Sequence, residues 1–385
     1  MKGFKNANVY VEGKGVIKTN IGVKNGKIAY IGDDESLITT PYDYDGSSIV
    51  VPGFIDQHIH GAAGADAMDG TVDALSTIAQ AVASEGTTSF LATTMTQSPE
   101  NILKAMDAVK VYMDSNFTCG AKVLGIHLEG PFISNKHVGA QPLEYVANPD
   151  VDVFDKYYNA SGKAIKIVSL APEVDGAKEL IYHLDKLGVV ASAGHTDAGY
   201  NDIESAIKSG LKNITHTYNA QKALHHREIG TVGSAMLFDE LNAEAICDTI
   251  HLSVPAIKLL IKNKPHDKLT LITDSMRAKH LSDGISELGG QEVIVKNGEA
   301  RLKNGALAGS ILKMNDAIKN VVEKCGVNFN DAIDFATANP AKNLGLYDQI
   351  GSIALNKSAD FAVLDKDYNV RLTVREGIVV YSKDN

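Results

Sequence analysis

The 385-residue sequence has no tryptophan, only 3 cysteines, and no apolar run long enough to cross a membrane. Cys119, Cys247 and Cys325 are odd in number and widely spaced, which argues against a disulfide framework or a thiolate zinc site. The start of the chain also lacks the apolar stretch of a signal peptide. We therefore expect a cytoplasmic protein whose cysteines are small core residues.

Positive charge is scarce as well. The 37 lysines and arginines are outnumbered by 47 aspartates and glutamates, which gives a formal net charge of −10. This balance offers no basic surface for nucleic acid or anionic lipid, so we predict neither nucleic acid nor membrane as a partner. A small molecule is favoured, and an anionic one would need a few local cations against this acidic background.

Short alternating segments bounded by Gly and Asn turns occupy both ends of the chain, residues 1–50 and 346–385. We expect these ends to pair in one small, discontinuous β-sandwich domain. Residues 51–345 instead alternate apolar β-rich runs with amphipathic stretches, over a length typical of a TIM barrel. The sequence thus predicts an α/β protein, a (β/α)8 TIM barrel with a small β-sandwich domain formed by both termini.

Eight runs rich in Val, Ile and Leu are the candidate barrel strands, because strands buried on both faces are apolar throughout. They cover residues 53–60, 88–96, 122–129, 165–173, 189–196, 213–220, 244–252 and 269–275. Amphipathic segments predict outer helices at residues 73–86, 99–115, 177–188, 200–210 and 254–264. The stretch 130–160 is loop-rich in this interpretation, and could form a wall of an active site.

Metal-binding side chains are concentrated where the predicted strands end, which is the catalytic face of a TIM barrel. They are His58, His60, Glu129, His195, His216 and Asp274. His58 and His60 are two residues apart, so both point to the same side of one strand. So many suitable residues at strand ends are hard to explain as independent core residues. Three further histidines, His127, His183 and His266, are interpreted as ordinary core or surface residues.

Four imidazoles and two carboxylates suit a first-row divalent ion, and Zn, Fe, Mn and Co are not distinguished. Glu129 has two oxygens and could bridge two ions, one shared with His58 and His60 and the other with His195 and His216. We expect one or two metal ions per subunit. Asp274 beside such an ion would act as general base and acid, taking a proton from water and passing it to the departing amine.

Phrases along nearly the whole chain resemble the amidohydrolase superfamily and, within it, the N-acetylglucosamine-6-phosphate deacetylases. They are VPGFIDQHIHG (51–61), GIHLEGPFIS (125–134), SAGHTDA (192–198), THTYNA (215–220), ITDSM (272–276), LAGS (307–310) and ATANPAKNLGL (336–346). The resemblance implies hydrolysis of N-acetylglucosamine 6-phosphate to glucosamine 6-phosphate and acetate, with Glu129, His195 and His216 as the main metal ligands. Some relatives have amides at the first-strand histidines, whereas this chain retains both.

The resemblance also assigns residues to the substrate. His251 would polarise the acetyl carbonyl and stabilise the oxyanion. Leu307 belongs to a matching motif, and Gln141 is nearest to the place where some relatives have a sugar-contacting histidine. For His251 the alternative is an ordinary core histidine.

A phosphate clamp is implied by Arg227 together with the backbone N–H groups of Asn219 and Ala220. The planar guanidinium suits phosphate because it donates two hydrogen bonds at once. In relatives this arginine can come from a neighbouring subunit, so we expect a homodimer with Arg227 near the interface. A solvated surface loop is the alternative for this arginine.

Other functions on the same scaffold stay open, because a fold does not determine its substrate. The alternatives are a deaminase, a cyclic-amide hydrolase and an N-acyl amino acid deacylase. A non-catalytic barrel is disfavoured, because none of the expected ligands nor Asp274 is missing. The sequence does not separate the glucosamine from the galactosamine epimer.

Overall fold

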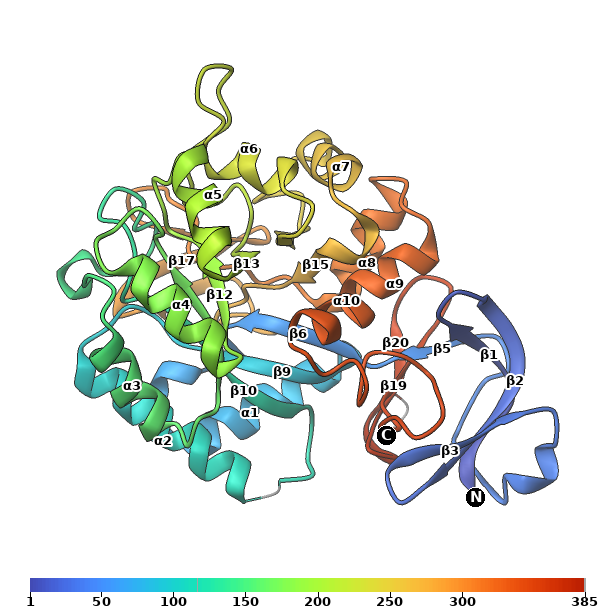
Figure 1. Ribbon diagram of the computed structural model, residues 1–385. Helices are drawn as coiled ribbons and strands as arrows, with labels where there is room; N and C mark the ends of the chain where they lie inside the picture. The colour runs from blue at the N-terminus through green and yellow to red at the C-terminus, as the bar shows by residue number, and fades with distance from the viewer. Residues whose placement is uncertain (116, 384–385) are drawn as a thin grey trace.

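The computed structural model describes residues 1–115 and 117–383. A parallel sheet lies at its centre, with the strand order β15-β14-β13-β12-β11-β10-β9-β6 (Figure 1). Its members in chain order are β6 (Phe54–Ile59), β9 (Thr87–Thr93), β10 (Lys122–Glu129), β11 (Ile165–Leu170), β12 (Val190–Ala193), β13 (Leu211–Ile214), β14 (Asn242–Ile246) and β15 (Leu269–Ile272). All eight predicted strands are present, although several end earlier than expected.

The first and last strands of this sheet meet and close it into a barrel. The Asp274 N–H donates to the His58 carbonyl oxygen at 2.8 Å. The Ser275 carbonyl oxygen accepts from the N–H groups of both His60 and Gly61 at 2.9 Å. Because these bonds join the chain after β15 to the end of β6, the predicted (β/α)8 barrel is confirmed.

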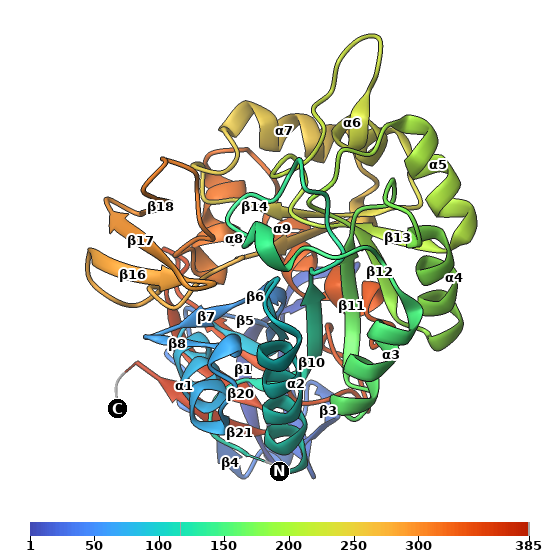
Figure 2. The ribbon, with the colours of Figure 1, turned by 90° about the vertical axis from the view of Figure 1, so that its left-hand side faces the viewer.

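Helices surround the sheet on its outer side (Figures 1 and 2). They are α1 (Val72–Ala83), α2 (Pro99–Asp114), α3 (Val151–Ala160), α4 (Ala177–Leu187), α5 (Tyr200–Ser209), α6 (Gly230–Leu237), α7 (Val254–Asn263), α8 (Met314–Glu323), α9 (Phe329–Ala336) and α10 (Ala338–Asn343). Side chains of Thr71 and Ser98 cap α1 and α2 by accepting from backbone N–H groups. None of the helices in the described ranges has the length and apolarity needed to span a bilayer.

The prediction that residues 130–160 are loop-rich is wrong for the last ten of them, which form α3. Asp150 caps this helix by accepting from the Val153 N–H, and Phe154 and Tyr157 are buried one turn apart. This short apolar stripe was too narrow to stand out in the sequence. A small antiparallel sheet of β16 (Gly284–Leu288), β17 (Gln291–Lys296) and β18 (Glu299–Leu302) was also not predicted (Figure 2).

Strands from both termini form a second, eight-stranded sheet, at the right of Figure 1. They are β1 (Lys2–Val11), β2 (Gly15–Lys24), β3 (Lys27–Gly32), β4 (Thr40–Pro41), β5 (Ile49–Pro52), β19 (Phe361–Leu364), β20 (Val370–Arg375) and β21 (Ile378–Ser382). The two ends join where β19 pairs antiparallel with β5, Val363 opposite Val50. Their apolar core includes Phe4, Ile21, Val50, Phe361 and Val374. The expected pairing of the termini is confirmed, while the domain limits 1–50, 51–345 and 346–385 stay a prediction.

A buried ion pair ties the end of α1 to the segment that follows β15. Lys279 Nζ lies 3.0 Å from Glu85 Oε1, and the two side chains are 0% and 1% exposed. His280 Nε2 is 2.7 Å from the same oxygen. Burial opposes ionisation of Glu85, but the charges of Lys279 and His280 hold the pKa of its carboxyl below the ordinary value. The pair is therefore both ionised and buried, and the loss of one partner should cost stability.

We expect Lys279→Met to lower the free energy of unfolding by about 3 to 5 kcal/mol, because Glu85 would be left buried without its main countercharge. Lys208→Met is the matched control, since Lys208 pairs with Glu204 on the exposed face of α5 and its loss should change stability by less than about 1 kcal/mol. Urea unfolding of both variants measures the difference. Equal stabilities would contradict a structural role for the buried pair.

Candidate metal centre and substrate cavity

The six predicted metal-binding side chains converge at the carboxyl ends of the barrel strands, and all are buried. His58 lies on β6, and Glu129 is the last residue of β10. His60 directly follows β6, and the other three lie two residues beyond a strand end: His195 after β12, His216 after β13 and Asp274 after β15. Because parallel strands end on one side of a barrel, residues far apart in the sequence meet there.

Glu129 stands between two groups of imidazoles. Its Oε1 lies 3.2 Å from His195 Nε2 and 3.1 Å from His216 Nε2. Its Oε2 lies 3.1 Å from His60 Nε2. Asp274 Oδ1 is on the same side as Oε2, at 3.2 Å from His60 Nε2 and 3.4 Å from His58 Nε2. The cluster therefore divides into Glu129 with His195 and His216, and His58 with His60 and Asp274.

Hydrogen bonds of the Nδ1 atoms, on the side of each ring away from Glu129 and Asp274, fix the orientation of three imidazoles. His58 Nδ1 donates to Glu244 Oε2 at 3.2 Å, His60 Nδ1 to the Thr93 carbonyl at 3.2 Å, and His195 Nδ1 to the His137 carbonyl at 2.9 Å. A neutral imidazole that donates from Nδ1 carries a lone pair on Nε2. The Nε2 lone pairs of all three rings therefore lie against the carboxylates of Glu129 and Asp274.

This arrangement fits a divalent cation. The Nε2 atoms of His195 and His216 are only 3.1 Å apart, with a carboxylate oxygen beside both. Where both rings carry a lone pair on Nε2, as His195 does when its Nδ1 donates, these lone pairs repel one another unless a positive charge lies between them. In addition, His58 Nε2 is buried and lacks a hydrogen-bond partner among the described residues. Imidazole nitrogens and carboxylate oxygens are the ligands that zinc and similar first-row ions prefer.

The two carboxylates are held in their ionised form. When no cation is bound, protons on His58 and His60 take its place: burial opposes these charges, but the neighbouring carboxylates raise the pKa values of both rings. Burial opposes the charge on Glu129, but the field of His58 and hydrogen bonds with His195 and His216 then keep its pKa well below the ordinary value. Burial likewise opposes the charge on Asp274, yet the field of His58 and the hydrogen bond with His60 lower its pKa to about 2. Both groups thus present negative charge to a cation at neutral pH.

Three of the site residues have left-handed backbone conformations, with φ of 47° at His195, 29° at His216 and 48° at Asp274. Such conformations in non-glycine residues cost on the order of 1–3 kcal/mol each and persist only where the surroundings enforce them. The Asp274 N–H donates to His58, and its carbonyl accepts from the Ser310 N–H at 2.8 Å. The left-handed backbone explains why β12, β13 and β15 end before His195, His216 and Asp274.

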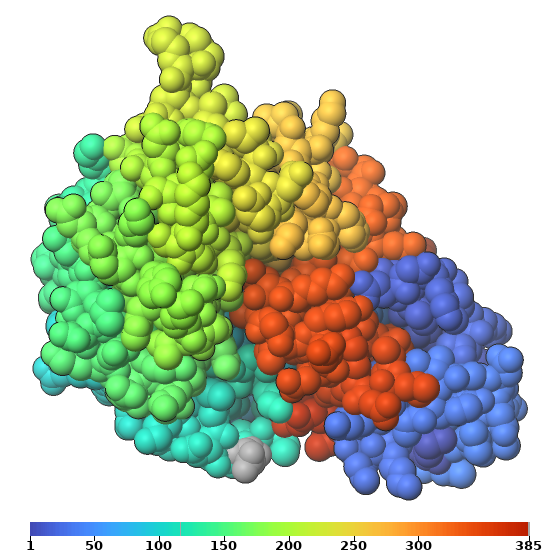
Figure 3. Space-filling model, viewed as in Figure 1, coloured from blue at the N-terminus to red at the C-terminus, as the bar shows by residue number. Residues whose placement is uncertain are grey.

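A cavity of about 360 Å³ opens over these side chains. Among the predicted substrate residues, those that line it are Gln141, Asn219, Ala220, His251 and Leu307. Arg227 lies elsewhere: it is exposed, and its Nη1 is 2.8 Å from His226 Nε2. Its loop, between β13 and α6, protrudes at the top of Figures 1 and 3. The structure therefore separates the predicted phosphate-binding arginine from the cavity of its own chain.

Two of the cavity residues already have partners within the protein. Gln141 Nε2 donates to Glu129 Oε2 at 3.0 Å, and its Oε1 accepts from the Thr96 N–H at 2.7 Å. The Asn219 N–H donates to the His216 carbonyl at 2.9 Å, whereas the Ala220 N–H has no acceptor among the described residues. Gln141 is thus a partner of the Glu129 carboxylate, and Ala220 supplies the open backbone donor.

Sequence reasoning missed three residues of the site. Glu244 contacts His58, and the carboxylate of Asp248 lies 2.6 Å from His251 Nδ1. His137 lines the cavity and contacts Asp197 at 3.2 Å. Asp248 could have been predicted, because it precedes the candidate residue His251 by only three residues and a carboxylate often binds the ring of such a histidine. Glu244 could not, because it is the first residue of the predicted strand 244–252, and catalytic residues of a barrel are expected where strands end.

The three histidines set aside in the sequence all have partners. His183 contacts Asp155 at 2.8 Å, and His266 contacts Asp334 at 3.2 Å. His127 is buried inside the barrel and uses both ring nitrogens, one with the Gln57 carbonyl at 3.2 Å and one with Ser169 Oγ at 2.7 Å. None of the three lines the cavity.

Comparison with known proteins agrees with this geometry. A model of the amidohydrolase family matches residues 49–380. The chain belongs to the amidohydrolase family. Enzymes of this family are generally metal-dependent, and the clustered His, Glu and Asp side chains are suited to bind a metal.

Within the amidohydrolase family, the chain is 41% identical to N-acetylglucosamine-6-phosphate deacetylase of Bacillus subtilis, over 98% of this chain and 96% of that protein. It is 35% identical to N-acetylgalactosamine-6-phosphate deacetylase of Escherichia coli O157:H7, over 84% and 86%. A solved structure of the Mycobacterium smegmatis deacetylase, a D267A mutant in complex with N-acetyl-D-glucosamine-6-phosphate, has a TM-score of 0.92 and 28% identity, over 99% and 100%. The resemblance noted in the sequence is confirmed.

We expect chelator-treated protein to be stabilised by added Zn²⁺, because a cation relieves the repulsion between the converging lone pairs. At a free metal concentration 100 times the Kd, the gain is about 2.7 kcal/mol. The thermal unfolding midpoint, followed against Zn²⁺ concentration, measures it. Glu129→Gln should lose most of the gain, whereas Glu204→Gln, on the exposed face of α5, should keep it. An undiminished gain in Glu129→Gln would contradict the assignment.

Proposed function

We propose that the protein hydrolyses the acetamido group of N-acetylglucosamine 6-phosphate in the cytoplasm, releasing glucosamine 6-phosphate and acetate. One observation carries the proposal: a buried set of metal-binding side chains, with Asp274 among them, lies at a small-molecule cavity in a chain closely related to deacetylases. N-acetylgalactosamine 6-phosphate is the second candidate substrate, because a relative named for that substrate is 35% identical.

The residues that would hold the metal are His58, His60, Glu129, His195, His216 and Asp274. We propose one or two divalent ions per subunit, of Zn, Fe, Mn or Co. A bound ion of this kind lowers the pKa of water and polarises a carbonyl oxygen. Glu129 would be shared by two ions, because its carboxylate contacts both groups: Oε1 lies beside His195 and His216, and also 3.4 Å from His58 Nε2, while Oε2 lies beside His60.

Asp274 would move the proton in this reaction. Its Oδ1 contacts the imidazoles of His58 and His60, so we assign the proton transfer to Oδ2. As a water molecule attacks the acetyl carbonyl carbon, Oδ2 takes its proton. When the carbon–nitrogen bond breaks, the same oxygen gives that proton to the amine nitrogen, and acetate and the amino sugar are formed.

His251 would stabilise the carbonyl oxygen as it becomes negatively charged. The Asp248 carboxylate lies 2.6 Å from His251 Nδ1 and so orients the ring, and a proton on the other ring nitrogen, Nε2, would be donated to the carbonyl oxygen. Gln141, Asn219 and Leu307 would contact the sugar, since all three line the same cavity. The Ala220 N–H would donate to the phosphate.

The phosphate needs positive charge that the cavity of a single chain does not supply freely. Besides His251 and the proposed metal ligands, the basic side chains that line it are Lys136 and His137, and both contact Asp197, at 2.8 and 3.2 Å. Arg227 is exposed on the protruding loop. We therefore propose a homodimer in which the partner's Arg227 binds the phosphate with two hydrogen bonds.

We expect Asp274→Asn to lower kcat by about 100-fold to 10,000-fold, because an amide cannot accept the proton. Acetate release is measured with the phosphates of both N-acetylated epimers. Metal content is measured in parallel, since Asp274 also contacts two ligands. A variant that keeps both its metal and its activity would contradict the proton-transfer role. Absence of acetate release by metal-replete wild type would overturn the sugar assignment.

For the dimer, we expect Arg227→Ala and Asp274→Asn to restore each other when their subunits are mixed. A mixed dimer has one intact site, with Asp274 from one chain and Arg227 from the other, so random mixing should recover about a quarter of wild-type activity. Each variant alone should be nearly inactive on the phosphorylated sugar. No recovery, together with a monomer in size-exclusion chromatography, would contradict the shared site.

A further inference from the structure

Glu244, on β14, is a fully buried carboxylate that no step of the proposed reaction uses. Its Oε1 accepts from Gln57 Nε2 at 2.7 Å and from Asn213 Nδ2 at 3.1 Å. Its Oε2 accepts from His58 Nδ1 at 3.2 Å and from the His216 N–H at 3.2 Å. Four donors, two from β6 and two from β13 and the residues just after it, therefore surround one carboxylate inside the barrel.

The two contacts of Oε2 reach both halves of the metal-binding cluster. His58 belongs to the group with His60 and Asp274, and His216 belongs to the group with Glu129. At His58 the carboxylate fixes the ring tautomer, which leaves the Nε2 lone pair toward the cluster. At His216 it holds a backbone that is strained, with a φ of 29°. The Glu244 carbonyl also accepts from the Thr217 N–H at 2.9 Å.

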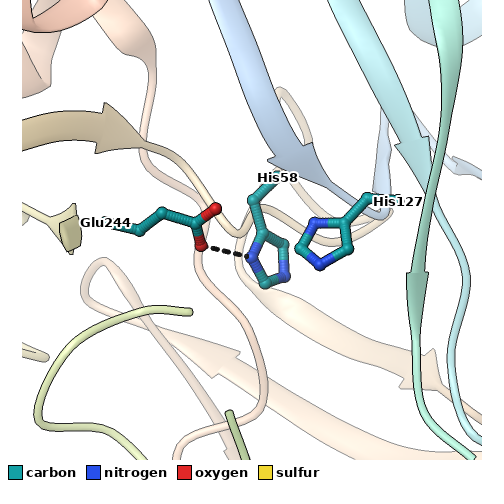
Figure 4. Close-up of side chains that lie close together, drawn as sticks. All are labelled: His58, His127 and Glu244. Carbon is teal, nitrogen blue, oxygen red and sulfur yellow. Dashed lines mark hydrogen bonds and ion pairs between the residues drawn. The ribbon is translucent and has the colours of Figure 1, made fainter. Parts of the chain in front are cut away.

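The neighbouring His127 raises the alternative of a separate cation site, because His58, His127 and Glu244 lie close together (Figure 4). The contacts argue against it. Both nitrogens of His127 bond to protein, to the Gln57 carbonyl and to Ser169 Oγ. His58 Nδ1 already donates to Glu244, as the dashed line in Figure 4 marks. A cation bound to one nitrogen of each ring and to Glu244 would have to displace two satisfied hydrogen bonds, one of His127 and the one between His58 and Glu244.

We propose that Glu244 is a positioning residue that couples the two halves of the metal centre, by orienting the His58 ring and holding the His216 backbone with one carboxylate oxygen. A carboxylate behind a ligating imidazole also makes that imidazole a stronger base, and its loss typically weakens metal binding by about 10-fold to 100-fold. The inference rests on the proposed metal centre, so its test first measures the wild type.

The experiment compares Zn²⁺ affinity in wild type, Glu244→Gln and Glu85→Gln, by competition with a fluorescent chelator. Glu85 is the matched control: it is equally buried, lies in the same barrel and contacts none of the proposed ligands. We expect affinity to fall about 10-fold to 100-fold in Glu244→Gln and to stay unchanged in Glu85→Gln. If wild type itself binds no metal, the proposed centre fails instead.

Two results would overturn the inference while leaving the metal centre intact. One is that Zn²⁺ affinity does not fall specifically in Glu244→Gln. It would then be either unchanged in that variant or lowered equally in Glu244→Gln and Glu85→Gln, and Glu244 would be an ordinary structural residue. The other is the loss of a whole metal equivalent in both Glu244→Gln and His127→Asn with no change in the remaining affinity, which would make the cluster in Figure 4 a cation site.

If Glu244→Gln does not fold, NMR spectroscopy of the wild type tests whether Glu244 holds the His58 Nδ1 proton. In Co²⁺-loaded wild type, the His58 Nδ1 proton should give a hyperfine-shifted NMR signal, assigned by its loss in His58→Asn. We expect this proton to exchange slowly with solvent, because Glu244 is buried and accepts it. Rapid exchange, at the rate of an exposed imidazole, would overturn the inference.

Discussion

The hydrogen bond from the Asp274 N–H to the His58 carbonyl, at 2.8 Å, is the contact on which the site depends. It joins the last barrel strand to the first, and so brings side chains from opposite ends of the barrel sequence into one cluster. The Ser310 N–H binds the Asp274 carbonyl on the other side. With both main-chain groups fixed, Asp274 is held in a left-handed conformation beside His58 and His60.

Below the cluster, the barrel interior is polar where barrels of this type usually contain branched apolar side chains. A chain of hydrogen bonds crosses from strand to strand, through His127, Ser169, Thr215, Ser192, Asn213, Asn242 and Thr270. Asn213 also donates to Glu244. Buried networks whose members are all bonded restrict side chains to one arrangement, and this one supports the imidazoles above it.

Much of this arrangement follows from the sequence. The apolar runs predicted the strands, and the two-residue spacing of His58 and His60 predicted that both face one side. Helix α3 was missed because its apolar stripe is short. Glu244 was missed because nothing in the local pattern distinguishes a strand glutamate that faces solvent from one that lies inside a closed barrel. The strand ends were placed too late because left-handed residues such as His216 are set by tertiary contacts.

Chemistry and substrate choice use different parts of the chain. The groups that would activate water and move its proton lie on or beside rigid strands, and their geometry is held by backbone hydrogen bonds. The cavity wall instead comes from connecting segments, such as the one that carries His137 and Gln141. Arg227 is on a loop that extends away from the barrel (Figure 3). Because loops tolerate change better than strands, the same barrel can keep its hydrolytic centre while its loops select which amide reaches it.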